Sequence, residues 1–303
     1  MSGPPRLFDR ALHRRRLARA APGYARAAFL KVRAAEDLVQ RLEAVMRDFP
    51  VALDLGARDG GFARALAASD AAAKVGLLIE ADLAPRMLAG RAGARVALDE
   101  EWLPFAPASL DLVVSALALH WTNDFIGALI QIRQALKPDG LFLAAILGGA
   151  TLTELRAALT DAELELSGGA GPRVSPFADA FDAAALLQRA GFALPVADVD
   201  RVTVRYDHLF AIIADLRAMA ETSVLIEGRR PLTRAVIARA AALYAERHAG
   251  ADGRIAATFE ILTLTGWAPA ASQPQPLRPG SATTRLADAL HAREHSAGEK
   301  AGE

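Results

Sequence analysis

An acid and a glycine-bearing loop follow the first apolar segment of the chain. Val51–Leu55 has the length and composition of a buried strand, with Asp54 near its end. The loop Gly56–Gly61 comes next, and the spacing of the apolar residues over 62–67 predicts a helix. A strand, a tight loop and a helix start in this order are typical of a nucleotide or nucleoside site in an open α/β sheet. We therefore expect this loop to bind a nucleoside-type ligand.

The loop departs from two common phosphate-binding patterns. Gly56 and Gly61 match the first and last glycines of the dinucleotide fingerprint G-x-G-x-x-G, but Arg58 replaces its middle glycine. That glycine lets the backbone approach a pyrophosphate, so the loop gives weak support for NAD or FAD. The chain also lacks the G-x-x-x-x-G-K-[ST] loop that surrounds the phosphates of ATP or GTP.

Strand and helix patterns alternate on both sides of this loop. We expect strands at residues 51–55, 74–80, 95–98, 110–115 and 141–147, with helices at 61–68, from Pro85 and at 123–136, and a turn at 137–140. Beyond Gly148 the patterns predict helices at 152–166, 182–190, 209–220 and 233–247, and strands at 196–206 and 258–267. This alternation predicts a Rossmann-like, doubly wound, mostly parallel seven-stranded sheet.

The chain of 303 residues is expected to have three parts. Residues 1–49 would form a helical extension or lid, in which an arginine-rich face either contacts solvent or docks a partner. Residues 50–268 would form the ligand-binding domain, with helical insertions at about 150–180 and 207–250. Residues 269–303, rich in proline, glycine and charge, are expected to be a mostly flexible tail with a short helix at 284–292.

Bulk composition limits the classes of function. The formal net charge is +0, which argues against nucleic acid as a partner. The chain has no cysteine, so thiolate chemistry and disulfides are excluded. Its longest apolar runs are far shorter than the roughly 20 residues that span a bilayer. We expect a soluble protein without a transmembrane segment and, from the arginine- and alanine-rich composition, one of bacterial origin.

Three motifs at the predicted strand ends resemble those of class I methyltransferases dependent on S-adenosylmethionine (SAM). Asp54–Gly60 resembles the first motif, D-x-G-x-G-x-G, although Arg58 stands where a glycine is usual. Ala81–Leu88 resembles the second motif and Asp99–Phe105 the third. The resemblance implies SAM as the cofactor, with Asp82, in competition with Glu80, on the ribose. The cofactor-binding residues that it implies are Asp54, Gly56, Ala57, Arg58, Gly60, Asp82, Leu83, Met87, Asp99, Glu100, Ser115 and Leu117.

Further stretches narrow the resemblance to one branch of that superfamily. Ser115–Asp124, Gly148–Arg156 and Val174–Phe177 are similar to the respiratory complex I assembly factors that act as arginine hydroxylases. The resemblance implies a complex I subunit as partner and transient contact with membrane-associated assembly intermediates. The location would be the bacterial cytoplasm or inner-membrane surface, or the mitochondrial matrix of a eukaryote. The sister family, the malonyl-carrier-protein O-methyltransferases, leaves carboxylate methylation open as an alternative, and a non-catalytic assembly chaperone is a third.

The remaining candidate residues each have two interpretations. His120 follows the fourth predicted strand, where it would act as a general base or as a hydrogen-bonded structural histidine. Trp121 would form a wall of the cofactor or substrate pocket, or belong to the core. Glu154 and Arg156 would line the substrate entrance or form a surface ion pair, and Tyr24 would close over SAM. No H-x-D/E pattern is present, so we expect no metal site.

Overall fold

The computed structural model describes residues 6–177, 179–228, 231–274, 281 and 284–293. Residues 1–270 form one compact unit and residues 271–303 a second, which contains the short helix α9 (Leu286–Ala289). Much of the predicted tail, namely residues 275–280, 282–283 and 294–303, lies outside the described residues. No helix within the described ranges combines the length and the apolar composition that crossing a membrane requires.

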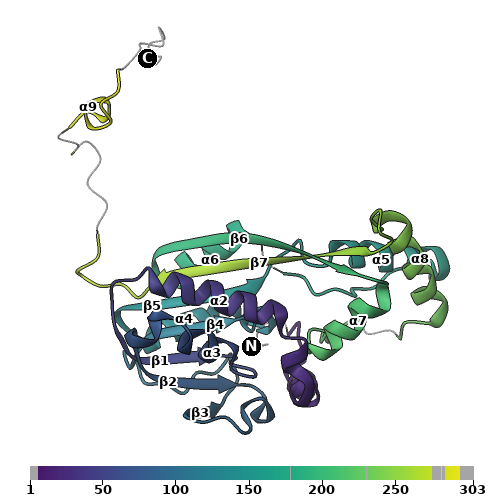
Figure 1. Cartoon of the computed structure of the whole chain (residues 1–303), viewed down its shortest axis with the longest axis horizontal. Helices are drawn as coiled ribbons and strands as arrows, with labels where there is room; N and C mark the ends of the chain where they lie inside the picture. The colour runs from purple at the N-terminus through teal and green to yellow at the C-terminus, as the bar shows by residue number, and fades with distance from the viewer. Residues whose placement is uncertain (1–5, 178, 229–230, 275–280, 282–283, 294–303) are drawn as a thin grey trace, which may run out of the picture. The chain divides into compact units, whose positions relative to one another are not determined.

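Seven strands form one sheet within the described part of the chain (Figure 1). They are β1 (Phe49–Leu55), β2 (Val75–Asp82), β3 (Ala94–Ala97), β4 (Leu110–Ala116), β5 (Leu136–Leu147), β6 (Ala193–Tyr206) and β7 (Ile255–Trp267). Their order is β3-β2-β1-β4-β5-β7-β6, and only the pairings of β7 with β5 and β6 are antiparallel. The prediction of a Rossmann-like, mostly parallel seven-stranded sheet is confirmed.

Helices cover both faces of this sheet. They are α1 (Arg10–Ala20), α2 (Phe29–Glu43), α3 (Gly61–Ala67), α4 (Phe125–Ala135), α5 (Thr153–Ser167), α6 (Ala180–Arg189), α7 (Leu209–Ala218) and α8 (Arg234–His248). Alternate residues of a strand point to opposite faces. Leu112 and Val114 of β4 accordingly pack in one core cluster with α2, α3, α5, α7 and α8, whereas Val113 packs in another with α4 and α6.

The N-terminal helices form part of the core that covers the sheet. Leu38 and Leu42 of α2 are fully buried and pack in the same cluster as Phe49 and Ala52 of β1. A 3-10 turn, η1 (Ala21–Arg26), joins α1 to α2. Division of the chain at residue 49 therefore stays a prediction, because buried contacts cross this point.

Three local predictions are wrong. The helix expected from Pro85 is only a 3-10 turn, η3 (Pro85–Leu88). The predicted turn at 137–140 lies inside β5, which begins directly after α4; its register shifts there against β4, and Asp139 takes a left-handed φ of 61°. The apolar spacing of Leu38, Leu42, Val45 and Met46 predicts a helix that ends just before Pro50, but α2 ends at Glu43, and Met46 lies beyond it and is 96% exposed.

Candidate functional site

The end of β1 is a buried polar compartment into which α2 inserts a lysine. Asp54 is fully buried, and neither of its carboxylate oxygens has a hydrogen-bond partner among the described residues. The Lys31 ammonium donates to the carbonyl oxygens of Gly56 (2.7 Å) and Ala116 (2.6 Å). Burial raises the pKa of Asp54 to about 7, and Lys31 opposes the shift. Acceptors at the ends of β1 and β4 are thus arranged around one cationic group.

Arg58 turns inward from the loop and pairs with the acid at the end of β2. Its Nη1 donates to Oδ2 of Asp82 (2.8 Å), both side chains are 0% exposed, and the Glu100 carboxylate lies 3.7 Å away. Burial disfavours the charge of Arg58, but Asp82 and Glu100 outweigh that cost and raise its pKa. Nε and Nη2 of Arg58 and Oε1 of Glu100 have no hydrogen-bond partner within the described ranges.

The loop that presents Arg58 is held by close backbone packing. Arg58 has a φ of 54°, and its backbone N–H also donates to Asp82 (2.9 Å). A Cβ atom on Gly56 would lie 2.2 Å from the Cβ of Ala118, so only glycine fits there. The backbone N–H groups of Gly56 and Ala57 donate to the carbonyl of Ala81. The loop geometry therefore ties β1 directly to β2.

The third predicted motif is held by α1. Arg10 donates to Asp99 (2.6 Å) and to the carbonyl of Trp121 (3.1 Å), and it also pairs with Glu100. Glu100 is fully buried, whereas the side chain of Asp99 is 25% exposed. Asp82, Asp99 and Glu100 are thus each paired with an arginine of the chain itself, whereas Glu101 accepts from Asn123.

Other predicted cofactor residues surround this compartment. Leu83 and Met87 pack with Tyr24 in a core cluster. The hydroxyl of Ser115 donates to the carbonyl of Leu55 (2.8 Å), which closes the β1–β4 pairing instead of pointing to a ligand. Gly60 has a φ of 76° and lies against the guanidinium of Arg91, which pairs with Glu80. Glu80 is therefore engaged away from Arg58, and Asp82 is the acid that faces the loop.

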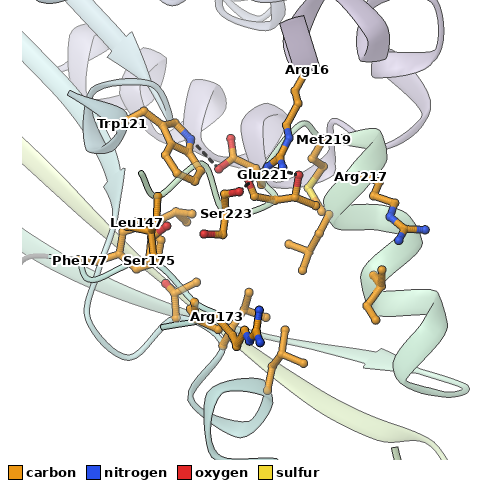
Figure 2. Close-up of a pocket in the computed structure, with 18 of the residues that line it drawn as sticks. Arg16, Trp121, Leu147, Arg173, Ser175, Phe177, Arg217, Met219, Glu221 and Ser223 are labelled. Atoms are coloured by element: carbon orange, nitrogen blue, oxygen red, sulfur yellow. Dashed lines mark hydrogen bonds between the residues drawn. The ribbon is translucent and has the colours of Figure 1, made fainter. Parts of the chain in front are cut away.

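A separate cavity of about 490 Å³ lies beside this compartment. It lies between the N-terminal helices, the helices α5, α7 and α8, the loop 172–177 and the segment 221–228 (Figure 2). Its walls are mostly apolar and include Leu147, Leu155 and Phe259. Lys31, Tyr24, Leu117 and Trp121 line it, while Asp54, Arg58 and Asp82 do not. A ligand in this cavity would therefore be next to the nucleoside-type motifs.

His120 and Trp121 meet at one carboxylate of the cavity wall. The indole N–H of Trp121 donates to Oε2 of Glu221 (2.9 Å), as Figure 2 shows, and Nε2 of His120 lies 3.2 Å from the same oxygen. Nδ1 of His120 is buried without a partner among the described residues. Both rings lie near other aromatic rings, Trp121 against Phe8 and His120 against Phe177. This geometry fixes the position of the Glu221 carboxylate, because Trp121 and His120 both contact the same carboxylate oxygen.

The remaining predicted substrate residues separate into two groups. Tyr24 is buried on the cavity wall, where burial raises the pKa of its hydroxyl. Glu154 instead accepts from the hydroxyl and the N–H of Thr258 and so joins α5 to β7. Neither Glu154 nor Arg156 lines the cavity. Among the described residues there is no group of three potential metal ligands.

The sequence gives little indication of two residues of this site. Lys31 lies on the apolar face of α2 and is 2% exposed, so a buried charge within a hydrophobic pattern was its only signal. Glu221 follows the end of α7, and only the weaker similarity of Asp215–Thr222 to the assembly-factor family points to it. Its role depends on tertiary contacts that no local pattern predicts.

Comparison with known families supports a methyltransferase-type fold. Residues 53–144 match the family model described as a methyltransferase domain. The chain is 38% identical over 93% of its length to the mitochondrial arginine-hydroxylase NDUFAF5 of Danio rerio, of which it covers 89%. The chain is also 38% identical over 93% of its length to the Homo sapiens protein of the same name, of which it covers 83%.

A second group of relatives is named for a different reaction. The malonyl-[acyl-carrier protein] O-methyltransferase of Laribacter hongkongensis is 35% identical over 87% of this chain and 91% of its own length. Among solved structures, a methyltransferase described as putative from Bacillus halodurans superposes with a TM-score of 0.53 at 16% identity. That match covers 78% of this chain and 99% of the other, and it supports the fold alone.

Replacement of Asp54 by Asn tests whether burial raises the pKa of this carboxyl group, because such a shift makes the stability of the protein depend on pH. The folded-state pKa of Asp54 is raised to about 7 from 3.8, so the folded protein binds this proton more tightly and the wild type loses stability as the pH rises between these values. Asp54→Asn removes this dependence. The free energy of unfolding of the wild type should fall relative to the variant by roughly 1 kcal/mol per pH unit between pH 4 and 7. Urea titrations at several pH values measure this free energy, and Asp70→Asn, at an exposed position, serves as the control. If the free energy of unfolding varied with pH in the same way in the wild type and in Asp54→Asn, the raised pKa of Asp54 would be contradicted.

Proposed function

We infer, since this chain belongs to the methyltransferase family that includes the NDUFAF5 arginine hydroxylases, that it hydroxylates an arginine side chain of another protein. The observation behind this proposal is the 38% identity over 93% of the chain, which covers 89% of the Danio rerio relative. A similarity that extends over both chains almost entirely includes the cavity as well as the nucleoside-type motifs. The cavity is large enough for a long side chain, and it lies directly beside those motifs.

The proposed partner is a subunit of respiratory complex I, modified while the complex is assembled. The support is the similarity of Ser115–Asp124, Gly148–Arg156 and Val174–Phe177 to the complex I assembly branch. In a bacterium this would take place in the cytoplasm, with transient contact to assembly intermediates at the inner membrane. In a eukaryote the corresponding compartment is the mitochondrial matrix, and the relatives of this chain are named as mitochondrial.

SAM is the cofactor of this family, and the acceptors at the strand ends fit its polar groups. The carbonyls of Gly56 and Ala116 accept hydrogen bonds from the Lys31 ammonium and would equally accept from the amino group of SAM. The buried Asp54 carboxylate, which has no hydrogen-bond partner among the described residues, is a further acceptor at the end of β1. Asp82 and Glu100 are acceptors suited to hydroxyl groups such as those of a ribose. In the described conformation, however, Lys31 contacts the two carbonyls, Arg58 contacts Asp82 and Arg10 contacts Glu100. SAM binding at these acceptors therefore requires these side chains to withdraw.

The two groups of relatives imply different uses of the cofactor. When bound, SAM supplies an activated methyl group, which carboxylate methylation transfers and hydroxylation does not consume. Hydroxylation converts a C–H bond of arginine to C–OH. With dioxygen as oxidant, one oxygen atom enters the product, and the other leaves as water after taking up two electrons and two protons from a two-electron donor.

Methylation of a carboxylate is the second candidate function. The observation that favours it is the 35% identity over 87% of the chain to the malonyl-carrier-protein O-methyltransferase. The exposed Arg217 on the cavity wall supplies a cation suited to such a substrate, and it has no ion-pair partner among the described residues.

Replacement of Arg58 by Gly tests whether this side chain limits cofactor binding. Glycine tolerates the positive φ at this position. We expect calorimetry to show SAM binding at least about tenfold tighter than in the wild type, equivalent to about 1.4 kcal/mol. Removing one partner of a buried ion pair costs about 3–5 kcal/mol of stability, so unfolding is followed in parallel. Asp82→Ala on the Arg58→Gly background should abolish the gain; equal affinities of wild type and Arg58→Gly would contradict this role of Arg58.

Mass spectrometry of complex I from a deletion strain tests the proposed function. Loss of this chain should leave one arginine of a subunit lighter by one oxygen atom than in the wild type. Complementation with the wild-type gene should restore the oxygen, and complementation with Asp82→Ala should not. Identical arginine masses with and without the chain would refute hydroxylation, and a lost methyl group on a carboxylate would favour the second function.

A further inference from the structure

Glu221 is a nearly buried acid on the cavity wall with one oxygen available. Its side chain is 11% exposed, and Oε2 contacts both Trp121 and His120. Oε1 makes no hydrogen bond with any described residue. The other acid of the described lining, Glu227, is exposed. Because burying a carboxylate is costly unless it is paired, Glu221 is suited to a cationic ligand.

The basic side chains on the described part of the cavity wall do not neutralise Glu221. Arg16 donates to the carbonyls of Thr222 (2.6 Å) and Ser223 (2.5 Å). Lys31 is bound to backbone carbonyls, and Arg173 pairs with Glu163. Arg217 also lines the cavity, but it is exposed and forms no ion pair with Glu221. The one described group within ion-pair distance of Glu221 is His120, which is charged only when protonated. A ligand cation would therefore meet an acid that is held in place but not already paired with an arginine or lysine.

The shape and lining of the cavity favour a guanidinium over a compact cation. A planar guanidinium forms two parallel hydrogen bonds to a carboxylate and stacks on aromatic rings. Trp121, Tyr24 and Phe177 supply aromatic rings, and Leu147 and Leu155 supply an apolar surface for an aliphatic stem. An incoming carboxylate would instead be repelled by Glu221 at this wall.

We propose that Glu221, held by Trp121 and His120, is the specificity-determining residue that receives the guanidinium group of the substrate arginine. This assignment rests on the proposed function and adds the residue that selects the substrate side chain. Trp121 and His120 act as positioning residues, since each contacts the same carboxylate oxygen and leaves the other oxygen for the substrate.

Binding of two small probes to the intact chain tests the assignment. Nα-acetyl-arginine methylamide has the guanidinium, and its citrulline counterpart has nearly the same shape without the charge. The chain has three tryptophans, so the indole N–H resonance of Trp121 is assigned by comparison with Trp121→Phe. We expect the arginine probe to shift this resonance saturably and the citrulline probe to bind at least about tenfold more weakly, as expected for loss of a charged hydrogen-bonded pair.

Two variants test whether Glu221, and not another acid of the cavity wall, causes the preference for the arginine probe. Glu221→Gln keeps an acceptor for Trp121 but should remove the preference for arginine over citrulline, whereas Glu227→Gln should retain it. Thermal unfolding checks that both variants are folded. The comparison of the arginine and citrulline probes on the wild type tests the assignment even if a variant does not fold. Equal binding of the two probes by the wild type, absence of a saturable shift, or an unchanged preference in Glu221→Gln would overturn the assignment. A guanidinium preference that depends on Glu221, together with unmodified arginine in the cell, would refute only the proposed function.

Discussion

The buried ion pair between Arg58 and Asp82 is the constraint on which the site depends. Two charges that are 0% exposed are tolerated only when they satisfy each other, and here the loop after β1 and the end of β2 each supply one. The pair fixes Arg58 in a left-handed conformation and closes the compartment that the family motifs define. The chain's own cations therefore take the acceptors that a cofactor with an amino group and hydroxyl groups would use.

The N-terminal helices connect this compartment to the cavity. Arg10 of α1 contacts Asp99, Glu100 and the carbonyl of Trp121, and Lys31 of α2 contacts the ends of β1 and β4. Tyr24 of η1 lines the cavity between them. Movement of these helices would change the cofactor acceptors and the cavity wall together, so the N-terminal segment acts as part of the site.

The sequence was sufficient to predict a mostly parallel seven-stranded sheet and the acids at the strand ends, because strand and helix periodicities are local and the motif spacing is fixed. It was insufficient for Lys31 and Glu221, since their roles come from contacts between distant segments; Glu221 and His120 are 101 positions apart. It also predicted a turn at 137–140, where the register shift against β4 keeps the residues inside β5. Tertiary pairing there outweighs the local preference of a Pro-Asp-Gly sequence for a turn.

Reconstitution with purified components tests the central claim most directly. The chain is incubated with the isolated complex I subunit, dioxygen, a two-electron donor and SAM labelled in its methyl group, and the subunit is then analysed by intact mass and fragmentation. We predict the gain of one oxygen atom on an arginine side chain and no labelled methyl group. Transfer of the labelled methyl group, or an unchanged arginine under all these conditions, would contradict it.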